Sequence, residues 1–203
     1  MNMKKFLKGI LITLGSIVLL VGLLIGGLNV IKFGIYHEYY SIRTNICTNP
    51  GLNDDAIPQG IAVSQDEDLI LTSCYMKTNK PSRIYLTNTK NESRYVSLYQ
   101  DDKEFKGHVG GIGISNNLVF LANGGYVSIF DLNYLKNATS RIDLTIKVKV
   151  NGEDGVASCV FANSKYLFVA EFHDGKNYIT NHPIETNDGT YHAICSQYKL
   201  TDL

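Results

Sequence analysis

The feature that most constrains the fold is a pattern of short apolar strands that recurs about every fifty residues. Each copy opens with small residues and continues as an apolar run, so that Gly60, Gly111 and Ser158 occupy equivalent positions, 51 and 47 residues apart. A second apolar run follows each opening run after a polar turn. The opening runs lie at 59–63, 110–114 and 157–161, and the second runs at 69–72, 119–122 and 167–170. A period of this length indicates a repeat architecture.

Two further strands complete the pattern. Third strands are expected at 82–86, 126–132 and 193–198, and fourth strands at 95–98 and 142–148. Four short strands in meander order, separated by Gly, Asn and Asp turns, are typical of a propeller blade. Small residues suit the first strand of a blade, because that strand lines the crowded axis where neighbouring blades converge. A β-sandwich also has regularly spaced strands, but it does not require similar residues at matching offsets.

The sequence therefore predicts an all-β fold, a partial β-propeller of about three four-stranded blades within a domain at 56–203. The blades are expected at about 56–104, 105–150 and 151–203, after a polar linker at 32–55. Closed propellers typically use four to eight blades, and the third repeat lacks its outer strand. We therefore expect the chain to be the first half of a longer, six-bladed protein, shortened by an early stop or an incomplete gene.

Residues 9–31 form an uninterrupted stretch without Asp, Glu, Lys or Arg. As a helix these 23 residues would span roughly 35 Å, slightly more than the hydrocarbon core of a bilayer. Lys4, Lys5 and Lys8 precede the stretch, so the positive-inside rule keeps a short stub at 1–8 in the cytoplasm and places the rest of the chain outside. The alternative is a cleaved signal peptide, but its apolar region is normally only about 7–15 residues long.

The net charge of the chain bears on its partners, and its cysteine content bears on disulfide bonds. Beyond the basic stub, the chain carries 16 basic against 19 acidic side chains, which gives no electrostatic reason to bind nucleic acid. Cys47, Cys74, Cys159 and Cys195 are an even number in an oxidising compartment and allow three pairings. Free thiols and one or two disulfides both stay open at this point.

Four segments resemble those of a family of uncharacterised bacterial propeller proteins that are secreted or anchored in the membrane. They are Pro-Gly-Leu at 50–52, Pro-Gln-Gly-Ile-Ala at 58–62, Lys-Pro-Ser-Arg-Ile-Tyr at 80–85 and Gly-His-Val-Gly-Gly-Ile at 107–112. More distantly, the blades are similar to six-bladed calcium-dependent lactonases and strictosidine-synthase-like proteins. The family resemblance implies no activity, whereas the distant one implies a metal ion in the axial channel.

Candidate ligand-binding residues lie in the loops that enter first strands or leave second strands. They are His108, Asn123, Asp154 and Glu171. No catalytic residue and no metal site is assigned, but Asn123 and Glu171 carry the oxygens that a Ca²⁺ ion would take. Two of the four also have a structural interpretation: His108 precedes a tight glycine turn, and Asn123 begins an Asn-Gly turn of its own.

The leading functional hypothesis is a binding module of the cell envelope, anchored through 9–31 and facing a glycan, peptide or protein. A calcium-dependent hydrolase or lactonase is the alternative, and a truncated gene product without function is the third possibility. Repeated blades present a broad, rigid surface, and the 13 tyrosines of the chain suit amphipathic contacts.

Overall fold

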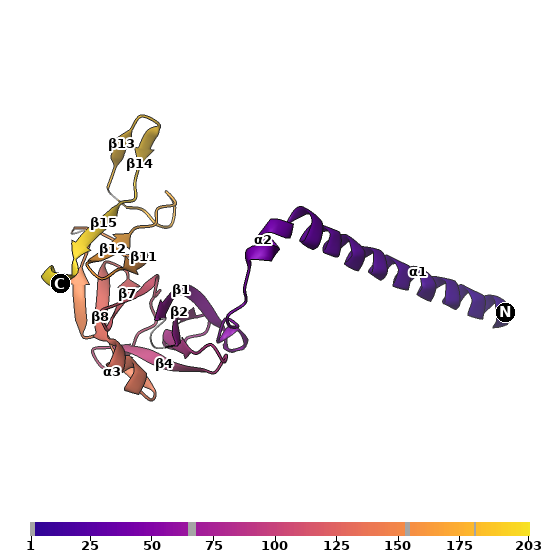
Figure 1. Ribbon diagram of the computed structural model, residues 1–203, viewed down its shortest axis with the longest axis horizontal. Helices are drawn as coiled ribbons and strands as arrows, with labels where there is room; N and C mark the ends of the chain where they lie inside the picture. The colour runs from indigo at the N-terminus through magenta and orange to yellow at the C-terminus, as the bar shows by residue number, and fades with distance from the viewer. Residues whose placement is uncertain (1–2, 65–67, 153–154, 181) are drawn as a thin grey trace. The chain divides into compact units, whose positions relative to one another are not determined.

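The computed structural model describes residues 3–64, 68–152, 155–180 and 182–203 (Figure 1). The chain separates into two compact units, Met1–Asn45 and Ile46–Leu203. The first unit is helical and the second consists mainly of antiparallel strands. This confirms the prediction of a β-rich fold that follows one apolar N-terminal helix.

The helical unit begins with α1, Met3–Val30, which continues through a π-helical turn, Ile31–Ile35. A short helix, α2, His37–Ile42, follows. The segment Met3–Ile35 has a mean hydropathy of 2.6 in its most apolar window, and none of that window is buried. A helix that is apolar on every face has no polar side to turn toward water, and this one is long and apolar enough to cross a membrane.

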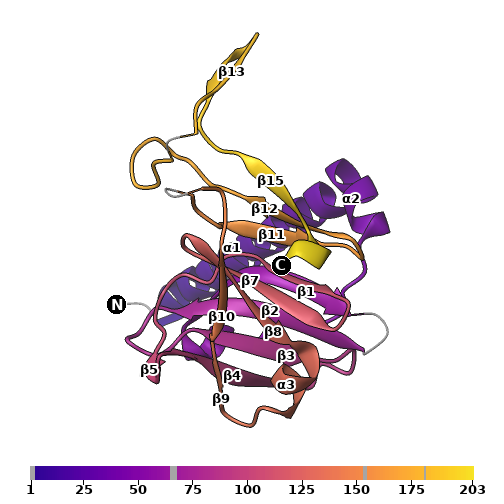
Figure 2. The same cartoon turned by 90° about the vertical axis from the view of Figure 1, so that its left-hand side faces the viewer.

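Three sheets form the second unit, and each corresponds to one copy of the repeat. The first contains β1 Ala56–Ser64, β2 Leu69–Met76, β3 Arg83–Thr87, β4 Ser93–Gln100 and β5 Lys103–Glu104. The second contains β6 Ile112–Ser115, β7 Leu118–Asn123, β8 Tyr126–Asp131 and β10 Ile146–Lys149. The third contains β11 Cys159–Ala162, β12 Tyr166–Ala170 and β15 Cys195–Lys199, which Figure 2 shows side by side. Within the described residues these sheets are open, and they close into no barrel or ring.

Smaller elements join and extend the sheets. A 3-10 turn, Leu52–Asp54, precedes β1, the helix α3 Leu132–Asn137 follows β8, and another 3-10 turn, Leu200–Asp202, follows β15. A separate hairpin, β13 Ile184–Thr186 and β14 Gly189–Tyr191, stands away from the three sheets (Figures 1 and 2). It lies within a polar insertion, residues 171–194, between the second and third strands of the last repeat.

The core consists of two apolar layers, one on each side of the second sheet. Val119 and Leu121 lie in the cluster that contains Ala62, Leu71 and Ile84 of the first sheet. The alternate residues of β7, Phe120 and Ala122, belong to the cluster with Val160, Leu167 and Val169 of the third sheet. Successive side chains of a strand point to opposite faces, so β7 contributes to both layers and is buried on both sides.

The structure differs from the sequence-based prediction at 142–148, where we expect a single fourth strand. Instead β9, Arg141–Asp143, pairs in parallel with β4 of the first sheet, and β10 pairs with β8 of the second. Burial drives the split: Ile142 and Leu144 both enter the layer between the first two sheets. The N–H of Leu144 donates to the carbonyl of Tyr99 at 2.8 Å, so the chain ties the two sheets together before it returns to β10.

All four cysteines are free thiols. Cys159 and Cys195 both pair with Ala170, from opposite sides of β12. They are therefore two strand spacings apart, about 9.6 Å, which is beyond the roughly 7 Å between Cα atoms that a disulfide can bridge. Both are exposed rather than buried in strands, whereas Cys74 is buried, and burial raises the pKa of its thiol to about 12.

Candidate functional site

The opening strands of the three repeats meet at glycines. A Cβ atom on Gly60 would lie 2.8 Å from the carbonyl oxygen of Gly110. On Gly110 it would lie 2.1 Å from the carbonyl oxygen of Ser158, and on Gly111 2.5 Å from the amide nitrogen of Val160. Real Cβ atoms do not approach so closely, so only glycine fits here. Backbone packing thus explains Gly60 in the Pro-Gln-Gly motif and Gly110 and Gly111 in the Gly-His-Val-Gly-Gly motif.

A β-bulge turns Gln59 out of the regular strand ladder. The register of β1 against β2 shifts between Pro58 and Gly60, so Gln59 has no Cα partner across the ladder. Its side-chain N–H donates to the carbonyl of Pro58 at 2.9 Å, which fixes the amide while leaving its oxygen as an acceptor. Bulges commonly re-aim a side chain beside a functional site, and the exposed Gln59 side chain does reach a cavity.

A cavity of about 530 Å³ lies at this end of the opening strands. It collects residues from all three repeats and from the insertion that follows β12. Its volume lies within the range of small-molecule sites. The lining residues are Gln59, His108, Gly110, Gly124, Val156, Ala157, Ser158, Cys159, Glu171, Phe172 and Tyr178.

The four candidate ligand-binding residues fall in different places. His108 and Glu171 both line the cavity, and the His108 ring rests on Tyr75 with 4.2 Å between ring centroids. Asn123 ends β7 and is not among the lining residues, although the next residue, Gly124, is. Asp154 lies outside the described residues.

Sequence reasoning missed most of the remaining lining residues. Gln59 belongs to the Pro-Gln-Gly motif, but residue types alone do not predict its bulge. Phe172 and Tyr178 lie in an insertion whose polar composition indicates a solvated loop. Their rings form an edge-to-face pair with centroids 5.5 Å apart, and both side chains stay about half exposed beside the cavity.

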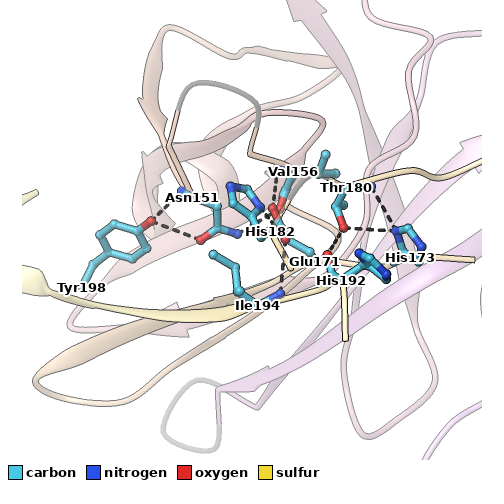
Figure 3. A network of polar contacts seen from close by, with 9 residues as sticks. All are labelled: Asn151, Val156, Glu171, His173, Thr180, His182, His192, Ile194 and Tyr198. Atoms are coloured by element: carbon cyan, nitrogen blue, oxygen red, sulfur yellow. Dashed lines mark hydrogen bonds and ion pairs between the residues drawn. The ribbon is translucent and has the colours of Figure 1, made fainter. Parts of the chain in front are cut away.

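Glu171 is held by the protein on every side (Figure 3). Its side chain is fully buried. One oxygen accepts the N–H of Val156 at 3.1 Å, and the other accepts the N–H of Ile194 at 3.2 Å and faces Nδ1 of His182 at 3.0 Å. A buried carboxylate needs such donors. Through these hydrogen bonds, Glu171 connects the loop before β11 to the end of the insertion.

A second polar group orders the insertion itself. Nδ1 of His173 accepts the N–H of Thr180 at 3.0 Å, and the Thr180 hydroxyl donates to the carbonyl of His192. The imidazoles of His173 and His192 stack with centroids 4.8 Å apart (Figure 3). Thr180 is buried, and this group ties the start of the insertion to its end at His192.

Two further contacts stabilise the same wall. The hydroxyl of Tyr198 accepts the N–H of Asn151 at 2.7 Å and approaches the Asn151 side-chain oxygen at 3.2 Å. The Asn151 side-chain amide in turn donates to the carbonyl of Val156 at 3.0 Å. The loop that supplies Val156 and Ala157 to the cavity is therefore bonded to β15 as well as to Glu171.

The metal ion that the distant resemblance implies does not fit these residues. Both oxygens of Glu171 are already engaged by N–H donors, and Asn123 does not line the cavity. Among the residues that the structure describes, no three His, Cys, Asp or Glu side chains form a group that could hold a metal ion. What the described lining offers is the aromatic pair of Phe172 and Tyr178, the amide of Gln59, the hydroxyl of Ser158 and the imidazole of His108.

Comparison with known proteins leaves the family open. No protein-family model matches the chain, and no curated protein matches it significantly. The resemblance drawn from the sequence motifs therefore stays a prediction, and the inference of function rests on the residues and geometry of the cavity.

Proposed function

We propose that this chain is a membrane-anchored binding protein of the cell envelope, in which the three sheets are blades of a β-propeller and the cavity receives the ligand. The observation that carries the proposal is the cavity at the convergence of the three opening strands. All three repeats contribute to it, and a polar network holds its wall. A pocket of this volume, with a few placed polar groups and aromatic rings, is the usual form of a small-ligand site.

The anchor supports a position at the outer face of the membrane. Lys4, Lys5 and Lys8 precede the apolar helix, and such a bias keeps the N-terminus in the cytoplasm. The β-rich unit would then face the envelope, where glycans and peptides are the abundant ligands.

Two exposed thiols test both parts of the proposal. Cys159 lines the cavity, whereas Cys195, on the same sheet, does not. In intact cells, a membrane-impermeant maleimide should label both cysteines, as read from the tryptic peptides. Labelling that requires permeabilised cells would contradict the extracellular orientation.

The same reagent tests ligand binding in membranes that carry the full-length chain. A soluble digest of cell-wall glycans and peptides should slow the labelling of Cys159 and leave that of Cys195 unchanged. Equal rates at both thiols, with and without the digest, would overturn the assignment of the cavity as a ligand site.

A further inference from the structure

The chemistry of the cavity points to a particular ligand class, an inference that rests on the proposed role of the cavity as a ligand site. The aromatic pair supplies one part of the argument. Phe172 and Tyr178 are about half exposed, although aromatic rings of this size normally gain by burial. Both line the cavity and lie outside the core clusters, so their exposed ring surface is available to a molecule that enters it.

Hydrogen bonds within the loop that carries these rings fix its conformation. The carboxylate of Asp174 accepts the backbone N–H groups of Lys176, Asn177 and Tyr178 at 2.9, 2.8 and 2.7 Å. Its own N–H donates to the carbonyl of Tyr178 at 3.0 Å. The Tyr178 N–H and its neighbours hold the pKa of Asp174 below its ordinary value. A preordered loop loses little entropy on binding.

The remaining lining residues supply hydrogen-bonding groups without a free charge. Gln59 keeps an acceptor oxygen, Ser158 brings a hydroxyl, and His108 brings an imidazole. Glu171 is the one acidic or basic residue in the described lining apart from His108, and its carboxylate is fully buried and bonded internally. The part of the lining that the structure describes thus offers a charged ligand no unpaired opposite charge to replace its hydration.

We infer that the cavity binds a neutral saccharide. The apolar C–H face of a pyranose ring would pack on the Phe172 and Tyr178 rings, while its hydroxyl or acetamido groups bond to Gln59, Ser158 and His108. Aromatic side chains combine a large apolar surface with low entropy loss, which suits a ligand that has one apolar and one polar face. The cavity volume accommodates a ligand of this class.

The test uses the full-length chain in lipid nanodiscs, because sugar-based detergents would compete for the cavity. N-acetylglucosamine and glucose serve as neutral probes, and glucosamine and glucuronate as their charged counterparts. Saturation-transfer NMR should detect at least one neutral probe, and that probe should slow maleimide labelling of Cys159 but not of Cys195. The charged counterparts should bind at least several-fold more weakly.

Matched variants locate the contact. Phe172→Ala should weaken the neutral probe roughly tenfold. Phe161→Ala removes a ring of comparable exposure from the third sheet, outside the cavity lining, and should leave affinity unchanged. Circular dichroism melting curves establish that both variants are folded.

The outcomes separate this inference from the proposed function. If the envelope digest protects Cys159 and no neutral sugar does, the cavity stays a ligand site but the saccharide assignment is overturned, and short peptides become the ligand to test. Equal binding of charged and neutral sugars, or equal losses in the two Phe variants, would also overturn it. If neither digest nor sugar protects Cys159, both proposals fall.

Discussion

The second and third sheets are built from similar strands but differ in how they are covered. In β7 four successive residues, from Val119 to Ala122, are fully buried, because the first sheet covers one face and the third covers the other. In β12 burial alternates, with Leu167 and Val169 fully buried and Phe168 only half-buried. Phe161 on the neighbouring strand is 62% exposed.

The two sheets are therefore stabilised in different ways. The second sheet is held by apolar packing on both sides and serves as the centre of the core. The third has one packed face, and its far end is held by the polar network around Glu171. The cavity lies where these two kinds of support meet, because the packed opening strands and the bonded insertion both contribute lining residues.

Two phenylalanines test most directly the difference in burial between the second and third sheets. Phe120→Ala removes a fully buried ring between the second and third sheets and should cost about 3–5 kcal/mol of unfolding free energy. Phe161→Ala on the exposed face of the third sheet should change it by less than about 0.5 kcal/mol. Urea unfolding of the two variants measures the difference, and similar losses would show that the third sheet is covered on both faces in solution.

The glycines at which the opening strands approach one another should be the next most sensitive to substitution. Gly110→Ala places a Cβ against the Ser158 carbonyl and should cost about 1–3 kcal/mol through overpacking. Gly113→Ala is the matched control, since its Cβ would meet its nearest neighbour at an ordinary 3.4 Å. The same urea midpoints should separate them. A Gly113→Ala loss as large as that of Gly110→Ala would refute the close approach of the opening strands.

The hydrogen bonds of Glu171 that hold the third sheet should contribute less to the free energy of unfolding. Glu171→Gln keeps one acceptor oxygen but turns an NH2 group toward the N–H of Ile194 or Val156, which should cost about 1–2 kcal/mol. Glu185→Gln, an exposed change on the β13–β14 hairpin, is the control and should have little effect. Thermal melting gives the stability, and faster hydrogen exchange at Val156 and Ile194 should accompany the Glu171 change alone. Unchanged hydrogen exchange at these two amides would contradict the role of Glu171 in connecting the two segments.

The ion pairs of Asp54 with Lys80 and Arg83, beside the first sheet, should have the smallest effect on stability. Hydrogen bonds from Lys80, 2.8 Å away, and from the largely buried Arg83 lower the pKa of Asp54 to about 2. Since the folded pKa is depressed, the stabilisation is present above the ordinary carboxylate pKa and is lost as the pH falls through about 2.

Asp54→Asn should therefore flatten the fall in stability between pH 5 and about pH 2, where the unfolded chain takes up this proton before the folded one. Denaturant midpoints across that range, for both proteins, check the sign. Asp102→Asn serves as a control because the Asp102 side chain, which pairs with Arg141, is 88% exposed, and such surface ion pairs contribute little. Parallel pH curves for the Asp54 variant and the wild type would rule out this ion pair as a source of acid stability.

Much of the fold could be predicted from the sequence, because the strands are short, apolar and repeated at nearly constant offsets. Period-two apolar runs and Gly or Asn turns are local signals, so the strands of all three repeats could be placed from them. The same signals could not divide 142–148 between two sheets, because that choice depends on Ile142 and Leu144 reaching a layer formed by distant strands. For the site, the loops around the opening strands led to His108 and Glu171 but not to Phe172 or Tyr178.

By itself, then, the amino-acid sequence determined an apolar helix long enough to cross a membrane and a set of antiparallel strands with glycines at their heads. Both follow from composition and spacing within a few residues. Only the tertiary structure decided that Gly60, Gly110 and Ser158 touch, that Gln59 leaves its ladder, and that the oxygens of Glu171 are used up inside the protein. These facts depend on backbone approach and hydrogen-bond partners far apart in the chain, which residue types alone do not specify.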